Sequence, residues 1–261
     1  MAAPRRLTED TRTRPAGFPE LAREIPRRSA HRRIAAFASD LDRTLLRPRG
    51  RPTIAGRTAL REARGMGLRT LLVSGREYSK LVVYARRFGA LDALVAENGA
   101  VVEAPIGAPP EYLGGARAEA IVRRLRATPG LHPRFGEAVA SVPIGERDRL
   151  AAALRGLPVR LIANVDRIMA LPPGVDKRYG TLRAMERLGI GRSGYAAIGD
   201  AENDLGLLGS ASLSGAVRNA ERRVRSSVDY ASRLPYAEGV LEFVRGPLAA
   251  RPRDEHRSSP P

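Results

Sequence analysis

Short apolar segments alternate with amphipathic segments between residues 31 and 248. Four segments are nearly continuous in apolar residues and short enough for buried strands: residues 34–39, 68–73, 91–96 and 195–198. Apolar residues at helical spacing predict helices over 53–66, 77–88 and 177–188. Strands that are apolar on both faces and alternate with helices predict an α/β fold: a Rossmann-like parallel sheet with helices on both faces.

Residues 106–173 follow a different pattern. Two predicted helices, over 116–127 and 146–154, flank a stretch that is interrupted by Pro and Gly, and a predicted hairpin pairs 159–164 with 167–171. We therefore expect a small α+β domain inserted into the α/β core. The pair Asn98-Gly99 between apolar residues predicts a further tight hairpin turn, which we favour over a loop that contacts substrate.

The two ends of the chain show no sustained period. Residues 1–30 are rich in Pro and Arg, and residues 249–261 are polar and end in two prolines, so both are predicted to be disordered tails. The predicted organisation is then 31–105 as the first part of the core, 106–173 as the insert and 174–248 as the second part of the core.

Targeting signals and cysteines are absent from this sequence. No apolar run approaches the ~20 residues of a membrane helix, the N-terminus has no apolar segment of signal-peptide type, and there is no cysteine. We expect a cytoplasmic protein without a membrane partner. The sequence does not predict an oligomeric state.

The net charge of +17 first suggests a nucleic-acid partner. The arginines are, however, spread over nearly every segment, and aromatic residues make up only 5% of the chain, so no stacking platform is apparent. We expect no specific nucleic-acid partner. One alternative remains open, a catalytically idle fold that binds polyanions through its Arg-rich surface.

Polar groups follow three of the predicted strands. Asp40 and Asp42 come after the first strand, Ser74 and Gly75 after the second, and the acidic segment 199–204 after the fourth. Because the carboxyl ends of parallel strands meet at one edge of a sheet, we expect these groups to lie together. Carboxylates suit Mg²⁺, and a hydroxyl with free backbone amides suits phosphate. Each pattern alone is also common in turns and helix caps, but their order indicates one phosphoryl-transfer site.

A fourth group comes from a helix start. Lys177 opens the predicted helix over 177–188, and only Lys80 and Lys177 among the 45 basic residues are lysines. A compact ammonium is a suitable partner for a phosphoryl oxygen and for a nucleophilic carboxylate.

These four segments, DLDRT (40–44), SGR (74–76), GVDK (174–177) and GDAEND (199–204), resemble the four motifs of the haloacid-dehalogenase superfamily. The resemblance covers roughly residues 34–245. The segments AENGA (96–100), VRNA (217–220) and EGV (238–240) are similar to the Cof-like branch and its archaeal phosphoglycolate phosphatase relatives. The insert falls between the second and third motifs, which resembles the placement of a small C2-type cap. Such a cap implies closure over the site and selection of the substrate.

The resemblance also implies roles for individual residues. Asp40 would be the nucleophile that forms an aspartyl-phosphate, and Asp42 the general acid and then the general base. The implied Mg²⁺ ligands are Asp40, the Leu41 carbonyl, the turn at Asp42, Asp200 and Asp204, the last as a ligand or a supporting residue. The implied phosphate-binding and substrate-binding residues are Thr44, Ser74, Gly75, Lys177 and Asn203, of which Asn203 would orient the acidic loop.

The expected activity is a Mg²⁺-dependent phosphatase that acts on a small phosphorylated metabolite, either phosphoglycolate or a sugar phosphate. A phosphomutase of the same superfamily is an alternative. The chain departs from the family at Arg43, where Gly is usual for its backbone freedom. We expect Arg43 to alter the flap beside the site or to add a cationic contact to substrate.

Overall fold

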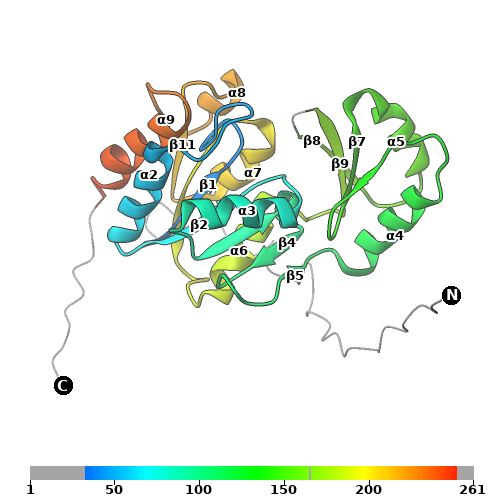
Figure 1. Cartoon of the computed structure of the whole chain (residues 1–261), viewed down its shortest axis with the longest axis horizontal. Helices are drawn as coiled ribbons and strands as arrows, with labels where there is room; N and C mark the ends of the chain where they lie inside the picture. The colour runs from blue at the N-terminus through cyan, green and yellow to red at the C-terminus, as the bar shows by residue number, and fades with distance from the viewer. Residues whose placement is uncertain (1–32, 165, 252–261) are drawn as a thin grey trace.

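The computed structural model describes residues 33–164 and 166–251, which form two sheets, each with its own apolar core (Figure 1). The predicted tail over 1–30 and residues 252–261 of the second tail lie outside the described residues. Residues 249–251 continue from the last helix, and Arg251 donates a hydrogen bond to the Ser212 carbonyl at 2.7 Å.

The larger sheet has eight strands in the order β12-β11-β10-β1-β2-β3-β4-β5. It is parallel from β12 to β3, whereas β4 and β5 at one edge are antiparallel. The bounds are β1 (Ile34–Asp40), β2 (Arg69–Val73), β3 (Ala93–Ala96), β4 (Val101–Glu103), β5 (Glu111–Tyr112), β10 (Gly194–Gly199), β11 (Leu213–Ala216) and β12 (Tyr230–Ala231). The four predicted strands and the parallel core are confirmed.

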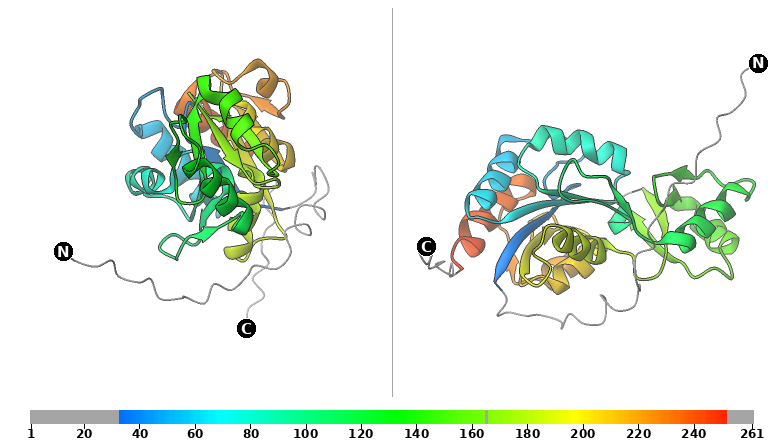
Figure 2. Two further views of the ribbon diagram at one scale, coloured as in Figure 1. Left: turned by 90° about the vertical axis from the view of Figure 1, so that its right-hand side faces the viewer. Right: turned by 90° about the horizontal axis from the view of Figure 1, so that it is seen from below.

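Helices cover both faces of this sheet (Figure 2). One face carries α2 (Ile54–Gly65), α3 (Tyr78–Phe88) and α9 (Tyr236–Phe243), and the other carries α6 (Lys177–Arg187) and α7 (Leu205–Ser210). Two helices begin at a side-chain cap: Thr53 accepts a hydrogen bond from the Gly56 amide, and Asp176 accepts one from the Tyr179 amide at 2.9 Å. The three predicted helices of the core are confirmed within two residues at each end.

Short elements complete the large domain. They are the 3₁₀ turns η1 (Glu97–Gly99) and η3 (Glu202–Asp204), helix α8 (Arg222–Arg225) and the π-helical turn η4 (Val244–Leu248). The η1 turn joins antiparallel β3 and β4, and Asn98 in it is left-handed at φ 54°. The predicted hairpin turn at Asn98-Gly99 is therefore confirmed.

The second sheet and its helices form a separate lobe, coloured green in Figure 1, which we call the cap (residues 115–171). Its sheet has the order β6-β7-β9-β8, with the bounds β6 (Arg134–Phe135), β7 (Ala140–Pro143), β8 (Arg160–Asn164) and β9 (Arg167–Leu171). Helices α4 (Gly115–Arg126) and α5 (Arg147–Ala153), the latter preceded by η2 (Ile144–Glu146), pack on this sheet through Ile121, Leu125, Leu150 and their neighbours. Since β5 belongs to the large sheet, residues 111–112 lie outside the cap, although the sequence placed them in the insert.

A small apolar cluster joins the cap to the core. It combines Ala100 and Val175 of the core side with Val139, Met169 and Leu171 of the cap. Within the described residues no helix is both long and apolar enough to cross a membrane.

Candidate active site

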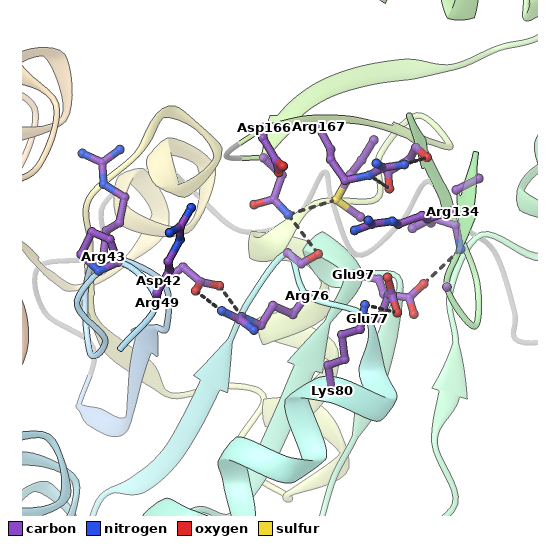
Figure 3. Close-up of a pocket in the computed structure, with 18 residues that line it drawn as sticks. Asp42, Arg43, Arg49, Arg76, Glu77, Lys80, Glu97, Arg134, Asp166 and Arg167 are labelled. Carbon is purple, nitrogen blue, oxygen red and sulfur yellow. Dashed lines mark hydrogen bonds and ion pairs between the residues drawn. The ribbon is translucent and has the colours of Figure 1, made fainter. Parts of the chain in front are cut away.

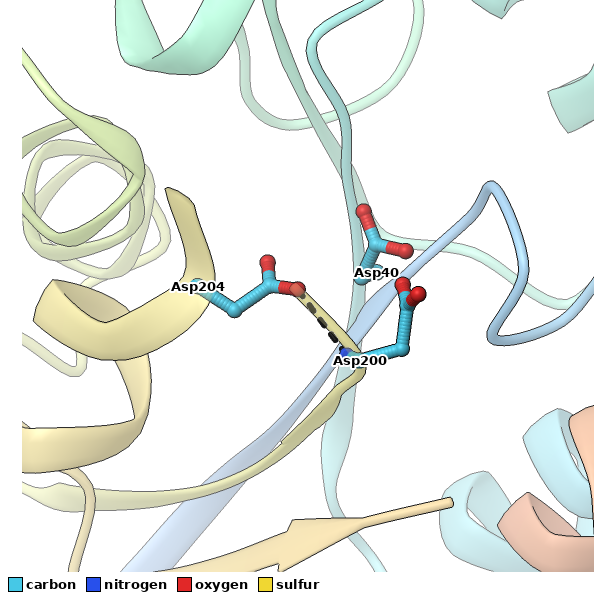
Figure 4. Close-up of side chains that lie close together, drawn as sticks. All are labelled: Asp40, Asp200 and Asp204. Carbon is cyan, nitrogen blue, oxygen red and sulfur yellow. Dashed lines mark hydrogen bonds between the residues drawn. The ribbon is translucent and has the colours of Figure 1, made fainter. Parts of the chain in front are cut away.

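Three carboxylates meet at the carboxyl ends of the neighbouring strands β1 and β10 (Figure 4). Asp40 is the last residue of β1, Asp200 follows β10, and Asp204 ends the η3 turn. All three side chains are buried, and one oxygen of each lies within 4.8 Å of the others. Carboxylates this close repel one another unless positive charge is placed among them.

Lys177 supplies one such charge. Its Nζ lies 2.7 Å from Asp40 Oδ1 and 2.7 Å from Asp204 Oδ1, and its side chain is buried. Burial alone would lower the pKa of Lys177, but the two carboxylates, Asp204 first, outweigh burial and hold this pKa above its usual value. Lys177 therefore favours its charged form in the site.

One ammonium does not balance three carboxylates. Burial raises the pKa of Asp40 well above its usual range. The charge of Lys177 opposes this rise, whereas the charges of Asp204 and Asp200 add to it. Burial, followed by the charge of Asp204, raises the pKa of Asp200 to about 7. Asp40 Oδ2 and Asp200 Oδ2 are buried without a hydrogen-bond partner among the described residues. In Figure 4 the carboxyl groups of these two residues face each other.

This arrangement fits a divalent cation. Two carboxylate oxygens that accept no hydrogen bond, in a buried and negatively charged cluster, offer the oxygen ligands that Mg²⁺ prefers. Asp204 is already engaged, because its Oδ1 accepts from Lys177 and its Oδ2 accepts from the Asp200 and Ala201 amides at 3.0 and 3.1 Å. The Leu41 carbonyl, also expected as a ligand, accepts hydrogen bonds from the Leu45 and Leu46 amides, so we do not include it in the ligand set proposed below.

Asp42 is not part of this cluster and lines the pocket described below. Both of its oxygens accept hydrogen bonds from Arg76, with Oδ2 at 2.8 Å from Nε and Oδ1 at 2.6 Å from Nη2. The guanidinium of Arg76 lies over the Tyr84 ring, 4.6 Å from its centroid. The Asp42 carboxylate is thus held in one orientation by a residue of the second motif.

The predicted phosphate-binding residues divide into two groups. Ser74 is buried at the end of β2, and its hydroxyl accepts from the Arg76 amide at 3.2 Å, so that the hydroxyl proton can be donated to a phosphate. Gly75 underlies the cap, because its carbonyl accepts from Asn164 and a Cβ added to it would lie 2.6 Å from the Asn164 side chain.

Thr44 and Asn203 instead support the carboxylates. Thr44 donates to Asp200 Oδ1 at 3.2 Å, and Asn203 donates to Asn98 Oδ1 at 3.1 Å, which ties the acidic η3 turn to η1.

Arg43 lies beside the cluster with its backbone in the left-handed region at φ 62°. The preference for Gly at this position has this physical reason, since a side chain is strained at such a φ. The Nε of Arg43 is 3.3 Å from Asp200 Oδ2, and its carbonyl accepts from Asn219 at 2.7 Å. Arg43 therefore provides a second positive charge at Asp200.

A pocket of about 420 Å³ lies between the core and the cap (Figure 3). Asp42, Gly75 and Arg76 line it from the core, and Arg134 and Arg167 from the cap. Of the residues that the sequence predicts for the site, Asp42 and Gly75 line this pocket.

Glu97 is a site residue whose role the sequence did not indicate. It is buried in η1, and its carboxylate accepts hydrogen bonds from the amides of residues 137, 138 and 139 of the cap at 2.7, 3.0 and 3.1 Å. Burial raises its pKa against the effect of these amides. The segment AENGA contained this residue, but its partner amides lie in an irregular stretch that the pattern left unassigned.

Comparisons with known proteins agree with this geometry. Residues 37–108 and 163–244 match the family model described as haloacid dehalogenase-like hydrolase. The chain is 29% identical over 221 residues to a phosphoglycolate phosphatase of Methanothermobacter thermautotrophicus, with 81% of this chain and 98% of that protein covered. It is 32% identical over 226 residues to a phosphoglycolate phosphatase of Pyrobaculum neutrophilum, with 81% and 96% covered.

The fold is also similar to that of a solved haloacid dehalogenase subclass IIB sugar phosphatase. The TM-score is 0.65 at 17% identity, with 80% of this chain and 97% of that chain covered. The matched segments contain all four motifs, which the structure brings to one edge of one sheet. The chain belongs to the haloacid dehalogenase-like hydrolase family.

Proposed function

We propose that this protein is a Mg²⁺-dependent phosphatase that removes phosphate from a small phosphorylated metabolite through Asp40. The observation that carries the proposal is the buried cluster of Asp40, Asp200 and Asp204. Its three carboxylates meet two cations, Lys177 and Arg43, and two of its carboxylate oxygens accept no hydrogen bond from a described residue. Such a cluster is unfavourable without further positive charge, and a phosphoryl-transfer site supplies it with a metal ion.

The proposed ligand set consists of Asp40 and Asp200, with Asp204 holding Lys177 and the turn after β10. When bound, Mg²⁺ would neutralise the charge that gathers on the phosphoryl oxygens. Lys177 would contribute a second, fixed positive charge to the same oxygens, and the Ser74 hydroxyl would donate to one of them.

The chain's own residues then account for both half-reactions. An Asp40 oxygen attacks phosphorus, the bond from phosphorus to the substrate oxygen breaks, and Asp42 gives a proton to the departing alcohol. In the second half-reaction Asp42 takes a proton from water, whose oxygen attacks the phosphorus of the aspartyl-phosphate and releases inorganic phosphate and free Asp40. During these steps Asp42 must exchange its Arg76 partner for the leaving oxygen or for water.

Phosphoglycolate is the first candidate substrate, because two relatives that align over most of this chain are named phosphoglycolate phosphatase. A sugar phosphate is the second candidate, since the pocket of about 420 Å³ has room for a molecule larger than phosphoglycolate.

The test is release of inorganic phosphate from phosphoglycolate, from glucose 6-phosphate and from p-nitrophenyl phosphate. We expect release that requires Mg²⁺, stops on addition of EDTA and is lost in Asp40→Asn. Asp148→Asn, an equivalent change at an exposed residue of α5, serves as the control. Undiminished activity in Asp40→Asn would exclude the assigned nucleophile, and an isomerised sugar phosphate in place of free phosphate would indicate a mutase.

A further inference from the structure

The cap presents two arginines to the pocket that the reaction proposed above does not use. Arg134 comes from β6 and Arg167 from β9, and both line the pocket opposite Asp42 (Figure 3). Both arginines belong to the sheet of the cap, whereas Asp40 and Asp200 lie at the strand ends of the large sheet.

The Arg167 side chain is fixed in place. Its Nε donates to the Ser141 hydroxyl at 2.9 Å, and its Nη2 donates to the carbonyls of Ser141 and His132 at 2.5 and 3.4 Å. These contacts take up one edge of the guanidinium. In the described part of the chain no carboxylate forms an ion pair with Arg167, although Asp166, Glu146 and Glu77 lie within electrostatic range.

Arg134 lies close enough to repel Arg167. Burial, and after it the charge of Arg134, lowers the pKa of Arg167. Two guanidinium groups that line one pocket repel each other, and an anion bound between them offsets this repulsion.

The high arginine content of this chain does not by itself account for this pair. The other cations of the pocket are mostly neutralised, since Arg76 pairs with Asp42, Lys80 with Glu77 and Arg43 with Asp200. Among the described lining residues, Arg49, Arg134 and Arg167 have no carboxylate partner, and two of these three are on the cap.

We infer that Arg134 and Arg167 form a cap subsite that binds a second anionic group of the substrate, a carboxylate or a second phosphate. This inference rests on the proposed phosphatase function and deepens it. The enzyme would then select phosphometabolites that are anionic at both ends, with the transferred phosphoryl group at Asp40 and the other anion against the cap. Arg167 is the specificity-determining residue of this pair, because its position is fixed by Ser141.

The experiment compares four substrates in Arg167→Gln, Arg134→Gln and wild type. The second anionic group is a carboxylate in phosphoglycolate and a phosphate in glucose 1,6-bisphosphate, whereas glucose 6-phosphate and p-nitrophenyl phosphate carry no second anion. Arg123→Gln removes the same charge from an exposed position on α4, away from the pocket, and is the matched control. Arg167→Lys keeps the charge but loses the planar fork that bonds Ser141.

We expect KM for the preferred doubly anionic substrate to rise roughly ten- to hundredfold in Arg167→Gln, the effect of losing a charge-assisted hydrogen bond. The kcat for this substrate should change much less. The ratio of kcat/KM for this substrate to kcat/KM for p-nitrophenyl phosphate should therefore fall by a similar factor. A smaller fall is expected in Arg167→Lys and none in Arg123→Gln. Whether phosphoglycolate or the bisphosphate shows the effect identifies the second anion.

An unchanged substrate ratio in both Arg167→Gln and Arg134→Gln would overturn the subsite. Arg134→Gln is unlike a change at a packed residue, because the Arg134 side chain is exposed and forms no hydrogen bond or ion pair with a described residue, so its replacement should leave the cap folded. If wild type hydrolyses none of the substrates, the phosphatase proposal fails separately. The subsite is then tested by calorimetry, with phosphoglycolate and glucose 1,6-bisphosphate each titrated into wild type and into Arg167→Gln. If the variant binds each compound as tightly as wild type does, the subsite is again overturned.

Discussion

At the residue scale, the site is governed by an imbalance of buried charge. Lys177 forms hydrogen bonds of 2.7 Å with Asp40 and with Asp204, while among the described residues Asp200 has only the half-exposed Arg43 as its ion-pair partner. Opposite charges inside a protein are stabilising only when each is matched by a partner of good geometry. The described residues leave the cluster short of positive charge, and a divalent ion would complete it.

Arg43 is expected to compete with that ion for Asp200. In Arg43→Gly the strained φ of 62° is relieved, and the guanidinium 3.3 Å from Asp200 Oδ2 is removed. We predict that Mg²⁺ binds roughly two- to fivefold more tightly to this variant by titration calorimetry, because a half-exposed ion pair contributes about 0.2–1 kcal/mol.

Arg49→Gly is the matched control for this prediction. Arg49 also has a positive φ, 54°, but forms no ion pair with a described residue. Its replacement relieves a similar backbone strain and should leave the Mg²⁺ affinity unchanged. Equal or weaker Mg²⁺ binding in Arg43→Gly would show that Arg43 does not occupy the ligand position.

At the element scale, the η1 turn determines where α6 begins and so where Lys177 lies. Gly99 has φ 99°, and a Cβ added there would lie only 1.9 Å from the Asp176 carbonyl oxygen. On the helix side Gly180 is also tightly packed, since a Cβ added to it would lie 2.7 Å from the Gly99 backbone. Two glycines therefore let the helix approach the hairpin turn closely enough to bring Lys177 to Asp40.

We predict that Gly99→Ala is far more harmful than an alanine at an equally left-handed but open position. Gly189, just after α6, has φ 75° and no atom within 4 Å of an added Cβ, so Gly189→Ala should cost roughly 1–2 kcal/mol of unfolding free energy. Gly99→Ala should cost more than about 3 kcal/mol and displace Lys177, with loss of phosphatase activity. Chemical denaturation measures both variants, and similar costs would disprove the role of the close approach.

The sequence predicted the long elements but missed the short ones. Strands β1, β2, β3 and β10 have strong apolar runs, whereas β4, β5, β11 and β12 have two to four residues and form because a neighbouring strand offers hydrogen bonds. In the cap, β6 and β7 fall in a stretch that Pro and Gly interrupt, so no period was visible.

The same distinction applies to the candidate site. Asp40, Lys177, Asp200 and Asp204 could be predicted, because each stands in a motif at a strand or helix end, and the structure brings them together. Partners set by tertiary packing could not, such as Glu97 with the cap amides across the two domains, or Arg167 with Ser141 between neighbouring strands of the cap. The hydrogen bonds from the Leu45 and Leu46 amides to the Leu41 carbonyl could not be predicted either, because residue types do not show where a backbone carbonyl points within a turn.

At the scale of the whole molecule, the position of the cap over the core depends on a few contacts. The apolar cluster of Ala100, Val139, Met169, Leu171 and Val175 joins the two domains, and Asn164 of the cap bonds Gly75 of the core. Glu97 adds the most specific contact, because one buried carboxylate accepts three consecutive amides of the cap. The pocket exists only while these contacts hold the domains together.

Glu97→Ala is predicted to open the cap. The amides of residues 137–139 would lose their acceptor, and burying an unpaired amide costs about 1–3 kcal/mol, so exposure to water becomes favourable. Hydrogen exchange of these three amides should accelerate, and KM for phosphoglycolate should rise. Glu137→Ala, an exposed acid in the same loop, is the control. Unchanged protection of the amides in Glu97→Ala would contradict this role.

The central claim is that Asp40 itself carries the phosphoryl group during turnover. Brief reaction with substrate and Mg²⁺, followed by acid quench and borohydride reduction, converts an aspartyl-phosphate to homoserine, which peptide mass spectrometry locates along the chain. We predict homoserine at position 40, dependent on both Mg²⁺ and substrate. Substrate-dependent modification at another carboxylate, or phosphate release with Asp40 unmodified at every quench time, would contradict the account.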